Sequence, residues 1–559
     1  MAEFTARLRA WCRQFRRSED GSLLVFGLFL FSIFILMSGM AIDVMRAENR
    51  RVALSQALDR CALNAAALSQ ALDPETVLRD CVERDGMLPF LTSVQVHNQP
   101  GQRSVAAAGE IPLETLFMGS MGIERLSVDA SARAEEGRNR IEIVLVLDIS
   151  GSMNERQRMV GLREAAKNFV ESVLRDSAGE VSIAIVPYNA QVNIGSELAS
   201  FYNITHRSGL GVTVNGDMRR ANCVDFTTDV YDRVGLSRTE PLSASGWMDP
   251  APRVQFQNHA AGGAVPVEAV VPCRASTTNI IRLPDNDPDR LARHIDALAA
   301  EGNTSINIGM KWGSALLDPQ ARPVIDAFVN SGAVPSAFRG RPFDYNRPDV
   351  TKIIVLMTDG ANVIDDRLNE PYKTGLSPIF RGTDGHFSLH MPTGRPSAAG
   401  SNEYWVPHID SNPALNGAEG AWMPTPWGNA TATRLTWPEL WQYAAPQWVA
   451  WHLFARASST VHAERQAVHT LWVQRFLTRY GTQNSGTIKD DELQRICTAS
   501  KRQGVIIYGI AFSAPERGAQ MIQSCATSPD FAFRSSDNTQ LNAAFQAIAI
   551  NIGQLRLTN

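Results

Sequence analysis

Oxygen-bearing side chains recur at alternate positions in the segment Asp148-Ile149-Ser150-Gly151-Ser152. A carboxylate and two hydroxyls at this spacing in one tight loop can direct hard oxygen ligands toward a common point. Mg²⁺ prefers such a set, because it takes few protein ligands in near-octahedral geometry and keeps several of its waters. The segment therefore predicts a divalent-cation site for Mg²⁺, or else for Mn²⁺ or Ca²⁺.

The surrounding pattern indicates which elements hold this segment. Residues 141–147 form an apolar run, broken only by Glu142, that is typical of a buried central strand, and a helix is expected at 155–175. Further strands and helices alternate along the chain, with strands at 181–186, 353–357 and 504–512 and helices from 287, at 304–317 and at 537–552. This alternation predicts an α/β fold with a mostly parallel central sheet flanked by helices. Such sheets carry their sites at the carboxyl ends of the strands, where Asp148 stands.

The D-x-S-x-S motif after an apolar strand resembles the metal-ion-dependent adhesion site of von Willebrand factor type A (vWA) domains. That family adds a threonine that opens a later helix and an aspartate that ends a later strand. The segments containing Thr304 and Asp359 are similar to these two pieces. The resemblance implies a Rossmann-like vWA domain over residues 138–559. It also implies a metal ion held directly or through water, with an acidic side chain of a protein partner completing its coordination. The implied ligands are Asp148, Ser150, Ser152, Thr304 and Asp359.

A run of 21 residues without a charge, 22–42, precedes all of this. A helix of that length rises roughly 30 Å, enough to cross the hydrocarbon core of a membrane. Five arginines and three acidic residues lie before the run, and a basic flank favours a cytoplasmic N-terminus. We expect a cytoplasmic tail (1–20), a single transmembrane helix (21–45) in a bacterial inner membrane, and a periplasmic remainder. A cleaved signal peptide is the alternative, although the run exceeds the roughly 7–15 apolar residues of such peptides.

Residues 46–137 predict a helix that continues from the membrane and a small antiparallel sheet, as in a pilin-like α+β segment. Residues 16–72 resemble TadG-like proteins of Flp (Tad) pilus assembly, down to SQALDRCALNAAALSQAL. The resemblance implies pilins or other pilus-assembly proteins as partners, or incorporation into the pilus itself. Prepilin-type signals carry Glu at the fifth position after a cleavage-site Gly, but Phe26 stands at that position after Gly21. We therefore expect an uncleaved anchor.

The chain has seven cysteines, an awkward odd count for an exported protein. Cys12 lies on the cytoplasmic side of the predicted span, which leaves six in an oxidising compartment. Sequence alone cannot fix their connectivity, and six buried free thiols are the alternative. The last two also resemble a cysteine pair of TadG-like proteins. The simplest pairing by neighbourhood is Cys61–Cys81, Cys223–Cys273 and Cys497–Cys525.

Two stretches break the strand–helix rhythm and are expected to be insertions at one rim of the sheet, at about 190–280 and 362–460. Both are rich in Gly, Pro, Asn and aromatic residues, and the second contains most of the tryptophans. Tryptophans in loops usually form a local core, and stacking on a glycan is the alternative. The net charge of −4 gives no reason to expect a nucleic-acid partner.

No G-x-S-x-G elbow, H-E-x-x-H motif or P-loop lysine motif is present, so we do not expect an enzyme. His386 and His390 have a spacing that could hold zinc on a helix, but their segment reads as a loop. The aspartates at 285, 287 and 289 read as a capped helix start rather than a calcium loop. The leading hypothesis is a binding and assembly module. The rivals are an envelope tether with an idle metal site and, less strongly, an envelope glycan-binding protein or hydrolase.

Overall fold

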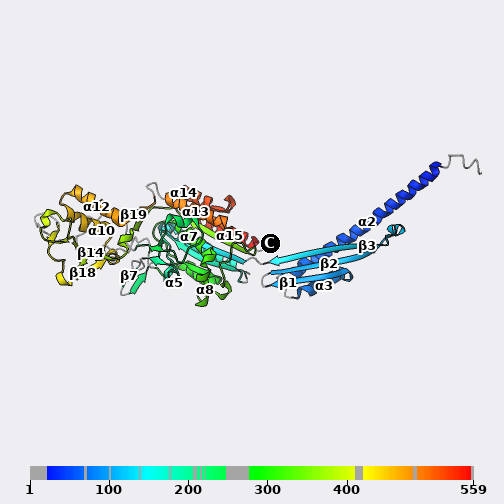
Figure 1. Cartoon of the computed structure of the whole chain (residues 1–559), viewed down its shortest axis with the longest axis horizontal. Coiled ribbons are helices and arrows are strands. Elements are labelled where there is room, and N and C mark those ends of the chain that lie inside the picture. The colour runs from blue at the N-terminus through cyan, green and yellow to red at the C-terminus, as the bar shows by residue number, and fades with distance from the viewer. Residues whose placement is uncertain are drawn as a thin grey trace, which may run out of the picture. The chain divides into compact units, whose positions relative to one another are not determined.

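A computed structural model of the chain describes residues 22–67, 72–99, 102–137, 140–175, 177, 179–205, 211–214, 217–220, 222–246, 273, 276–409, 419–481 and 487–555. The expected cytoplasmic tail, Cys12 and Gly21 lie outside these residues. The chain divides into two compact units, residues 1–138 and residues 139–558, each of which is described by itself (Figure 1).

The first unit is a long helix packed on a small antiparallel sheet. Helix α2 (Ser22–Ala66) continues without a break from the uncharged run into the alanine-rich segment. Its second half packs on strands β1 (Leu91–Gln99), β2 (Gln102–Glu114) and β3 (Arg125–Gly137), and the strands lie in that order. A short helix, α3 (Pro74–Arg84), begins at a proline capped by Asp73 and completes the unit. The expected helix and antiparallel sheet are both present.

Among the described residues, α2 is the helix long and apolar enough to cross a membrane by its length and composition. Its side chains from Leu23 to Met37 are largely exposed, whereas Leu54 and Leu58 farther along are fully buried against the sheet. The N-terminal half of α2 therefore exposes its apolar side chains, whereas its C-terminal half packs on the sheet. This pattern fits a membrane anchor or a signal sequence.

A six-stranded sheet forms the centre of the second unit, with four inner strands and two edge strands. Strand β4 (Arg140–Asp148) lies between β5 (Val181–Tyr188) and β12 (Val350–Thr358), and β20 (Ile506–Phe512) follows β12. These strands are parallel, as is the edge strand β21 (Ala532–Ser535), whereas the other edge strand, β11 (Arg282–Asp285), is antiparallel. The expected mixed α/β fold with a mostly parallel sheet is confirmed.

Helices cover both faces of this sheet, and alternate residues of β4 point to each of them. Ile143 and Leu145 lie in one core with helices α4 (Arg158–Leu174), α6 (Pro288–Ala297) and α15 (Asn538–Leu555). Val144 and Val146 lie in the other core. The helices that line this second core are α7 (Ile306–Leu317), α8 (Arg322–Asn330), α13 (Thr487–Arg502) and α14 (Glu516–Cys525). Burial on both faces explains why the central part of β4, residues 143–147, is continuously apolar.

The first insertion lies between β5 and β11. Its described residues include the short helix α5 (Gly195–Ala199) and a small sheet in which β10 (Leu242–Ala244) lies between β6 (Ile204–Thr205) and β9 (Val224–Asp225). A separate two-stranded pair, β7 (Gly211–Val214) and β8 (Asp217–Arg220), follows β6 in the chain. The Cys223–Cys273 disulfide joins the residue before β9 to a later part of this region, 50 residues further along the chain.

The second insertion leaves the sheet after β12 and returns at α13. Its first strand, β13 (Asp365–Leu368), pairs with its last, β19 (Leu477–Tyr480). Between them lies a five-stranded antiparallel sheet made of β14 (Leu376–Arg381), β15 (Phe387–His390), β16 (Tyr404–Val406), β17 (Ala421–Met423) and β18 (Thr433–Thr436). The insertion therefore extends to Tyr480, beyond the expected residue 460. Helix α12 (His462–Phe476) belongs to it because the helix packs on the insertion's own core.

The tryptophans of the second insertion form that core. Trp441 and Trp448 are fully buried, and Trp405, Trp437 and Trp451 are at most 8% exposed. Helices α9 (Trp437–Tyr443) and α10 (Pro446–Val449) carry three of these five side chains. Their aromatic faces contact one another and neighbouring side chains, so they do not offer a surface on which a glycan could stack.

All three expected disulfides are present. Cys61–Cys81 joins α2 to α3, and Cys223–Cys273 links two segments within the first insertion. Cys497–Cys525 joins α13 to α14, which cover the same face of the six-stranded sheet. The prediction by neighbourhood is therefore confirmed in full.

Acid should destabilise the second unit partly through His294 on α6. Burial, and then the charge of Arg282, lower the pKa of His294 to about 4. The unfolded chain, with an ordinary histidine pKa near 6.5, binds this proton more tightly, so stability is lost as the pH falls from about 6.5 to about 4. We expect His294→Gln to remove a pH-dependent loss on the order of 2 kcal/mol. Urea unfolding at pH 7.5 and pH 4.5 measures it, and an equal pH dependence in both proteins would contradict the assignment.

Candidate functional site

The carboxyl end of β4 delivers Asp148 into a fully buried position. One carboxylate oxygen, Oδ1, accepts a hydrogen bond from the backbone amide of Ser150 at 2.8 Å. The other, Oδ2, accepts from the hydroxyl of Thr358, the last residue of β12, at 2.7 Å. The loop after β4 and the end of the adjacent strand β12 therefore hold the Asp148 carboxylate in place by protein hydrogen bonds alone.

Two glycines allow the next loop to approach this one. The amide of Gly151 donates to the carbonyl of Gly302 at 2.8 Å, and the amide of Glu301 donates to the carbonyl of Ile149 at 2.8 Å. A Cβ on Gly151 would lie 3.2 Å from the Gly302 carbonyl oxygen, and Gly302 itself has a φ of +74°. The close backbone pairing brings the segment that contains Thr304 against the Asp148 loop.

Asp359 completes the cluster from the end of β12. Its Oδ1 accepts hydrogen bonds from the Ser152 hydroxyl at 2.7 Å and from the Ser150 hydroxyl at 3.4 Å. Thr304 lies beside the following residue, because a Cβ on Gly360 would stand 3.1 Å from the threonine Oγ1. The structure thus brings all five residues named from the sequence to one edge of the sheet.

The electrostatics of this cluster suit a cation. Burial, and then the nearby Asp359 carboxylate, raise the pKa of Asp148 to about 7. Asp359 is itself only 3% exposed, so two buried carboxylates lie beside hydroxyl groups that can act as oxygen ligands. A divalent ion would relieve the repulsion between the carboxylates, and the donor set is the hard-oxygen type that Mg²⁺ takes. The residues present therefore fit such an ion.

A neighbouring cation, Arg158, was not foreseen from the sequence. Its Nη1 donates to Oδ2 of Asp359 at 2.9 Å, and the side chain is 11% exposed. The two preceding residues, Arg156 and Gln157, have left-handed φ values of 48° and 58°. This uncommon backbone places Arg158 at the start of α4, next to the site. The motif gives no signal for it, because the reach depends on the turn rather than on side-chain spacing.

Arg158→Gln should raise the affinity for Mg²⁺ roughly tenfold, because the arginine's positive charge beside the Asp359 carboxylate opposes the approach of a second cation at effective dielectric constants near 20. Isothermal titration of Mg²⁺ into the detergent-solubilised chain measures the change. Arg163→Gln is the matched control, since Arg163 stands on the same helix and donates instead to the carbonyl of Leu298. Equal affinity in wild type and Arg158→Gln would show that the ion pair does not compete with the metal.

A buried lysine, Lys489, contacts the loop that carries Thr304. Lys489 on α13 is fully buried, and its Nζ contacts the Ser305 hydroxyl at 2.8 Å, the Val363 carbonyl at 2.7 Å and Asp365 Oδ1 at 2.7 Å. Val363 in turn donates its amide to the carbonyl of Thr304 at 3.1 Å. Both ends of the second insertion are thereby connected to the loop that carries Thr304. The sequence gives no sign of this contact, because the helix reads as an ordinary polar-faced helix.

His386 and His390, the alternative zinc candidates, have different partners. His390 pairs with Glu403 at 3.2 Å, whereas His386 packs against His408 with ring centroids 4.0 Å apart. The aspartates near 285 serve other roles. Asp287 caps α6 by accepting from the Arg290 amide at 2.9 Å, as expected from the sequence.

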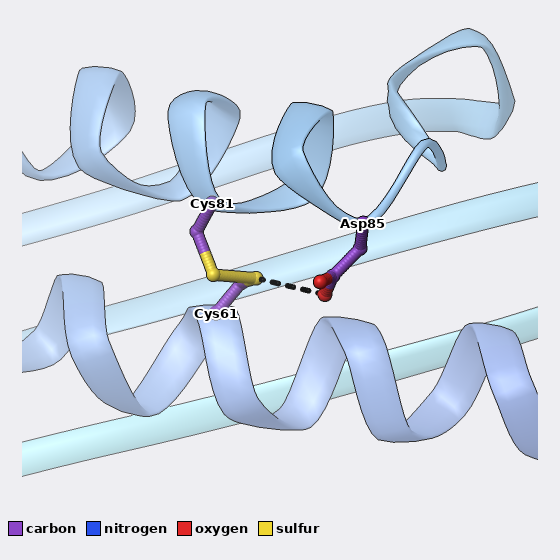
Figure 2. Close-up of side chains that lie close together, drawn as sticks. All are labelled: Cys61, Cys81 and Asp85. Carbon is purple, nitrogen blue, oxygen red and sulfur yellow. Dashed lines mark hydrogen bonds between the residues drawn. A yellow bond between two sulfur atoms is a disulfide. The ribbon is translucent and has the colours of Figure 1, made fainter.

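Figure 2 shows another cluster of ligand-type side chains, formed by Cys61, Cys81 and Asp85 in the first unit. Among the described residues, these are the three Cys, His, Asp or Glu side chains whose ligand atoms lie close enough together to share an ion. The two sulfurs are joined to each other in a disulfide, and Asp85 forms an ion pair with Arg60. No thiolate is available for coordination, so this cluster is a structural crosslink rather than a metal centre.

Several solved structures are distantly similar to the chain. The vWF domain of the type V pilus tip protein from Porphyromonas gingivalis is 12% identical, with a TM-score of 0.32 over 76% of this chain and 98% of that one. The adhesive tip pilin from Streptococcus agalactiae is 13% identical, with a TM-score of 0.30 over 74% and 99%. The pilus adhesin from Streptococcus pneumoniae is 11% identical, with a TM-score of 0.29 over 83% and 50%. TM-scores this low establish neither a common fold nor a common function.

No curated protein matches the sequence. A family model does match its N-terminal part, over residues 21–68. This stretch covers the expected transmembrane run and the alanine-rich half of α2. Residues 21–68 are thus similar to the Tad family, described as putative Flp pilus-assembly TadE/G-like.

Proposed function

We propose that this chain is a membrane-anchored component of Tad-type pilus assembly whose second unit is a vWA domain that binds a protein partner through a divalent ion. The observation that carries the proposal is the convergence of five oxygen-bearing side chains at the carboxyl edge of the parallel sheet. Asp148, Ser150, Ser152, Thr304 and Asp359 would hold the ion, some of them through water. The ion would supply an electrophilic centre for a partner's ligand.

The chemistry of the site favours an acidic side chain on the partner. Only two of the five residues are carboxylates, and Arg158 already neutralises part of the charge on Asp359. An ion with so few anionic ligands stays electron-poor and prefers another carboxylate over a neutral oxygen. The role proposed is therefore binding and assembly rather than catalysis.

The N-terminal unit supports the cellular setting. The match of residues 21–68 to the Tad family favours a place in the pilus machinery, with pilins or other assembly proteins as neighbours. The apolar half of α2 would anchor the chain in the bacterial inner membrane with a cytoplasmic N-terminus. The metal site would then face the periplasm or the outside of the cell. Disulfides in both units fit such an oxidising compartment.

A chromosomal Asp148→Asn substitution tests this proposal. We expect normal amounts of the protein in the membrane but loss of pilus assembly or of surface attachment, measured by electron microscopy and adhesion counts. Asp296→Asn is the control, because Asp296 is an exposed carboxylate that pairs only with Lys167 among the contacts described.

A structural tether with an idle metal site is the second candidate, and the Arg158–Asp359 ion pair favours it because the arginine takes up part of the charge that a metal would need. Normal piliation and attachment in the Asp148→Asn strain would favour the tether and overturn the metal-dependent binding role. Loss of either property without loss of the protein would exclude the tether.

A further inference from the structure

The turn that joins β2 to β3 carries a second apolar surface in the first unit. Residues 115–123, which we term the hairpin tip, read TLFMGSMGI and contain no charged side chain. Its large side chains are uncovered, with Leu116 65%, Met121 54%, Ile123 44% and Phe117 36% exposed. Exposed apolar groups in such a cluster are typical of a surface that contacts a membrane or another protein.

The hairpin tip packs against α2 at the end of the uncharged run. A Cβ on Gly39 would lie 2.5 to 2.7 Å from carbons of Phe117, so the helix and the tip are in direct contact there. Gly39 stands three residues before the run ends at Ile42. At a rise of about 1.5 Å per residue, the tip lies about one turn of helix inside the outer end of the apolar run. Figure 1 shows β2 and β3 running alongside α2 toward this point.

Asp43 fixes the tip by accepting hydrogen bonds from its backbone. The carboxylate is fully buried, and its oxygens accept from the amides of Leu116 at 2.9 Å, Phe117 at 2.8 Å and Met118 at 2.9 Å. A single acidic side chain on the helix therefore satisfies three consecutive amides of the turn.

The rest of the tip satisfies most of its own amides. Ser120 donates to the carbonyl of Phe117, Gly122 to that of Gly119 and Ile123 to that of Met118, at 3.1 to 3.2 Å. Turns in water also form such hydrogen bonds, although water can replace them there. A turn in contact with lipid does need them, because an unsatisfied backbone group there costs several kcal/mol.

Charged residues begin directly above the tip. Arg46 on α2 contacts the carbonyl of Glu114 at 3.4 Å, and Arg125 pairs with the side chain of Glu114 at 3.8 Å. Glu114 and Arg125 are 83% and 72% exposed, in keeping with a position in water. The boundary between uncharged and charged residues on the hairpin therefore falls beside the boundary on the helix.

We infer that the hairpin tip inserts into the outer leaflet of the same bilayer that α2 crosses, as a second membrane contact of the first unit. The inference rests on the membrane anchoring in the proposed function. A lipid surface is the partner that these observations favour. The exposed apolar tip adjoins the apolar part of the helix and lies at the same depth as the outer end of the uncharged run. Gly39 and Asp43 act as the positioning residues that hold the tip at that depth.

Depth-dependent fluorescence quenching in full-length protein reconstituted into phospholipid vesicles tests the inference. Cys12 is replaced by serine, so that a single introduced thiol takes an environment-sensitive label while the other six cysteines remain in disulfides. Met121→Cys reports on the tip and Phe31→Cys on the middle of the span. His97→Cys is the matched control, because it is an exposed position on β1 paired with Ser104, roughly 33 Å along the sheet from the tip.

The label at 121 should be quenched by lipids that carry a nitroxide near the headgroup and shielded from aqueous iodide, whereas the label at 97 should show the reverse. If 121 behaves like 97 while 31 is quenched by deep nitroxides, the tip lies outside the bilayer and only the anchor stands. If 31 is not quenched either, both the inference and the proposed anchoring fail. Shielding of 121 from iodide without quenching by any lipid would mean that protein covers the tip, which overturns the lipid assignment.

Discussion

Asp148→Asn should lower the affinity of the chain for Mg²⁺ at least about 100-fold, which corresponds to ~2.7 kcal/mol. The substitution removes one of the two carboxylates at the site and leaves only neutral oxygens on that side of the ion. Isothermal titration of Mg²⁺ into the detergent-solubilised chain measures the effect, with Asp296→Asn as the control. An affinity equal to that of wild type would show that the ion, if bound at all, is held elsewhere.

The same substitution should not unfold the protein. The asparagine side chain would keep acceptor capacity toward the Ser150 amide or the Thr358 hydroxyl, the two donors that Asp148 now satisfies. The change would also remove a buried carboxylate whose pKa is raised by burial and by Asp359. In metal-free buffer at pH 8 the variant should therefore melt at the same temperature as wild type or higher. Added Mg²⁺ should raise the Tm of wild type alone, because a ligand stabilises only the state that binds it.

Lys489→Met should destabilise the second unit by about 3–5 kcal/mol, the usual cost of removing one partner from a buried ion pair. Asp365 is 4% exposed and would be left with a poorly compensated charge, and the Ser305 hydroxyl and the Val363 carbonyl would lose their donor. Urea unfolding followed by tryptophan fluorescence measures the change.

The double variant Lys489→Met/Asp365→Asn separates the charge from the packing. It should recover part of the lost stability, because the unpaired carboxylate is then gone. A double variant less stable than Lys489→Met alone would show that Asp365 is compensated by another group, such as Arg367 at 3.6 Å. The single variant should also weaken Mg²⁺ binding, since Lys489 supports the loop of Thr304.

The central sheet could be predicted from the sequence because its strands are buried on both faces. Residues 353–357 are all apolar, and residues 141–147 are apolar apart from the buried Glu142. Neither stretch has an exposed side that would introduce alternation. The far end of the second insertion could not be predicted in the same way. Helix α12 has a polar, helical sequence that resembles a helix of the flanking layers, and only tertiary packing assigns it to the tryptophan core.

In the candidate site, too, some residues could be predicted from sequence motifs and others could not. Asp148, Ser150 and Ser152 share one short loop, and Thr304 and Asp359 stand in segments that resemble known pieces of one family. Arg158 was missed because its reach depends on the conformation of the turn before it, and Lys489 because its role depends on how α13 packs back against the site. The left-handed backbone before Arg158 and the buried approach of α13 have no signature in residue spacing.

The pairing of β13 with β19 has a consequence for how this protein can diversify. Leu368 and Leu477 face each other across the pair, so the subdomain between them begins and ends at almost the same point. Segments with adjacent ends can be exchanged or removed by recombination with little disturbance of the host fold. An exchange of residues 369–476 would leave Lys489 and the five residues of the candidate site in place. A replacement stretch would need a cation where Lys373 now stands, because its Nζ contacts Asp225 of the first insertion at 3.0 Å.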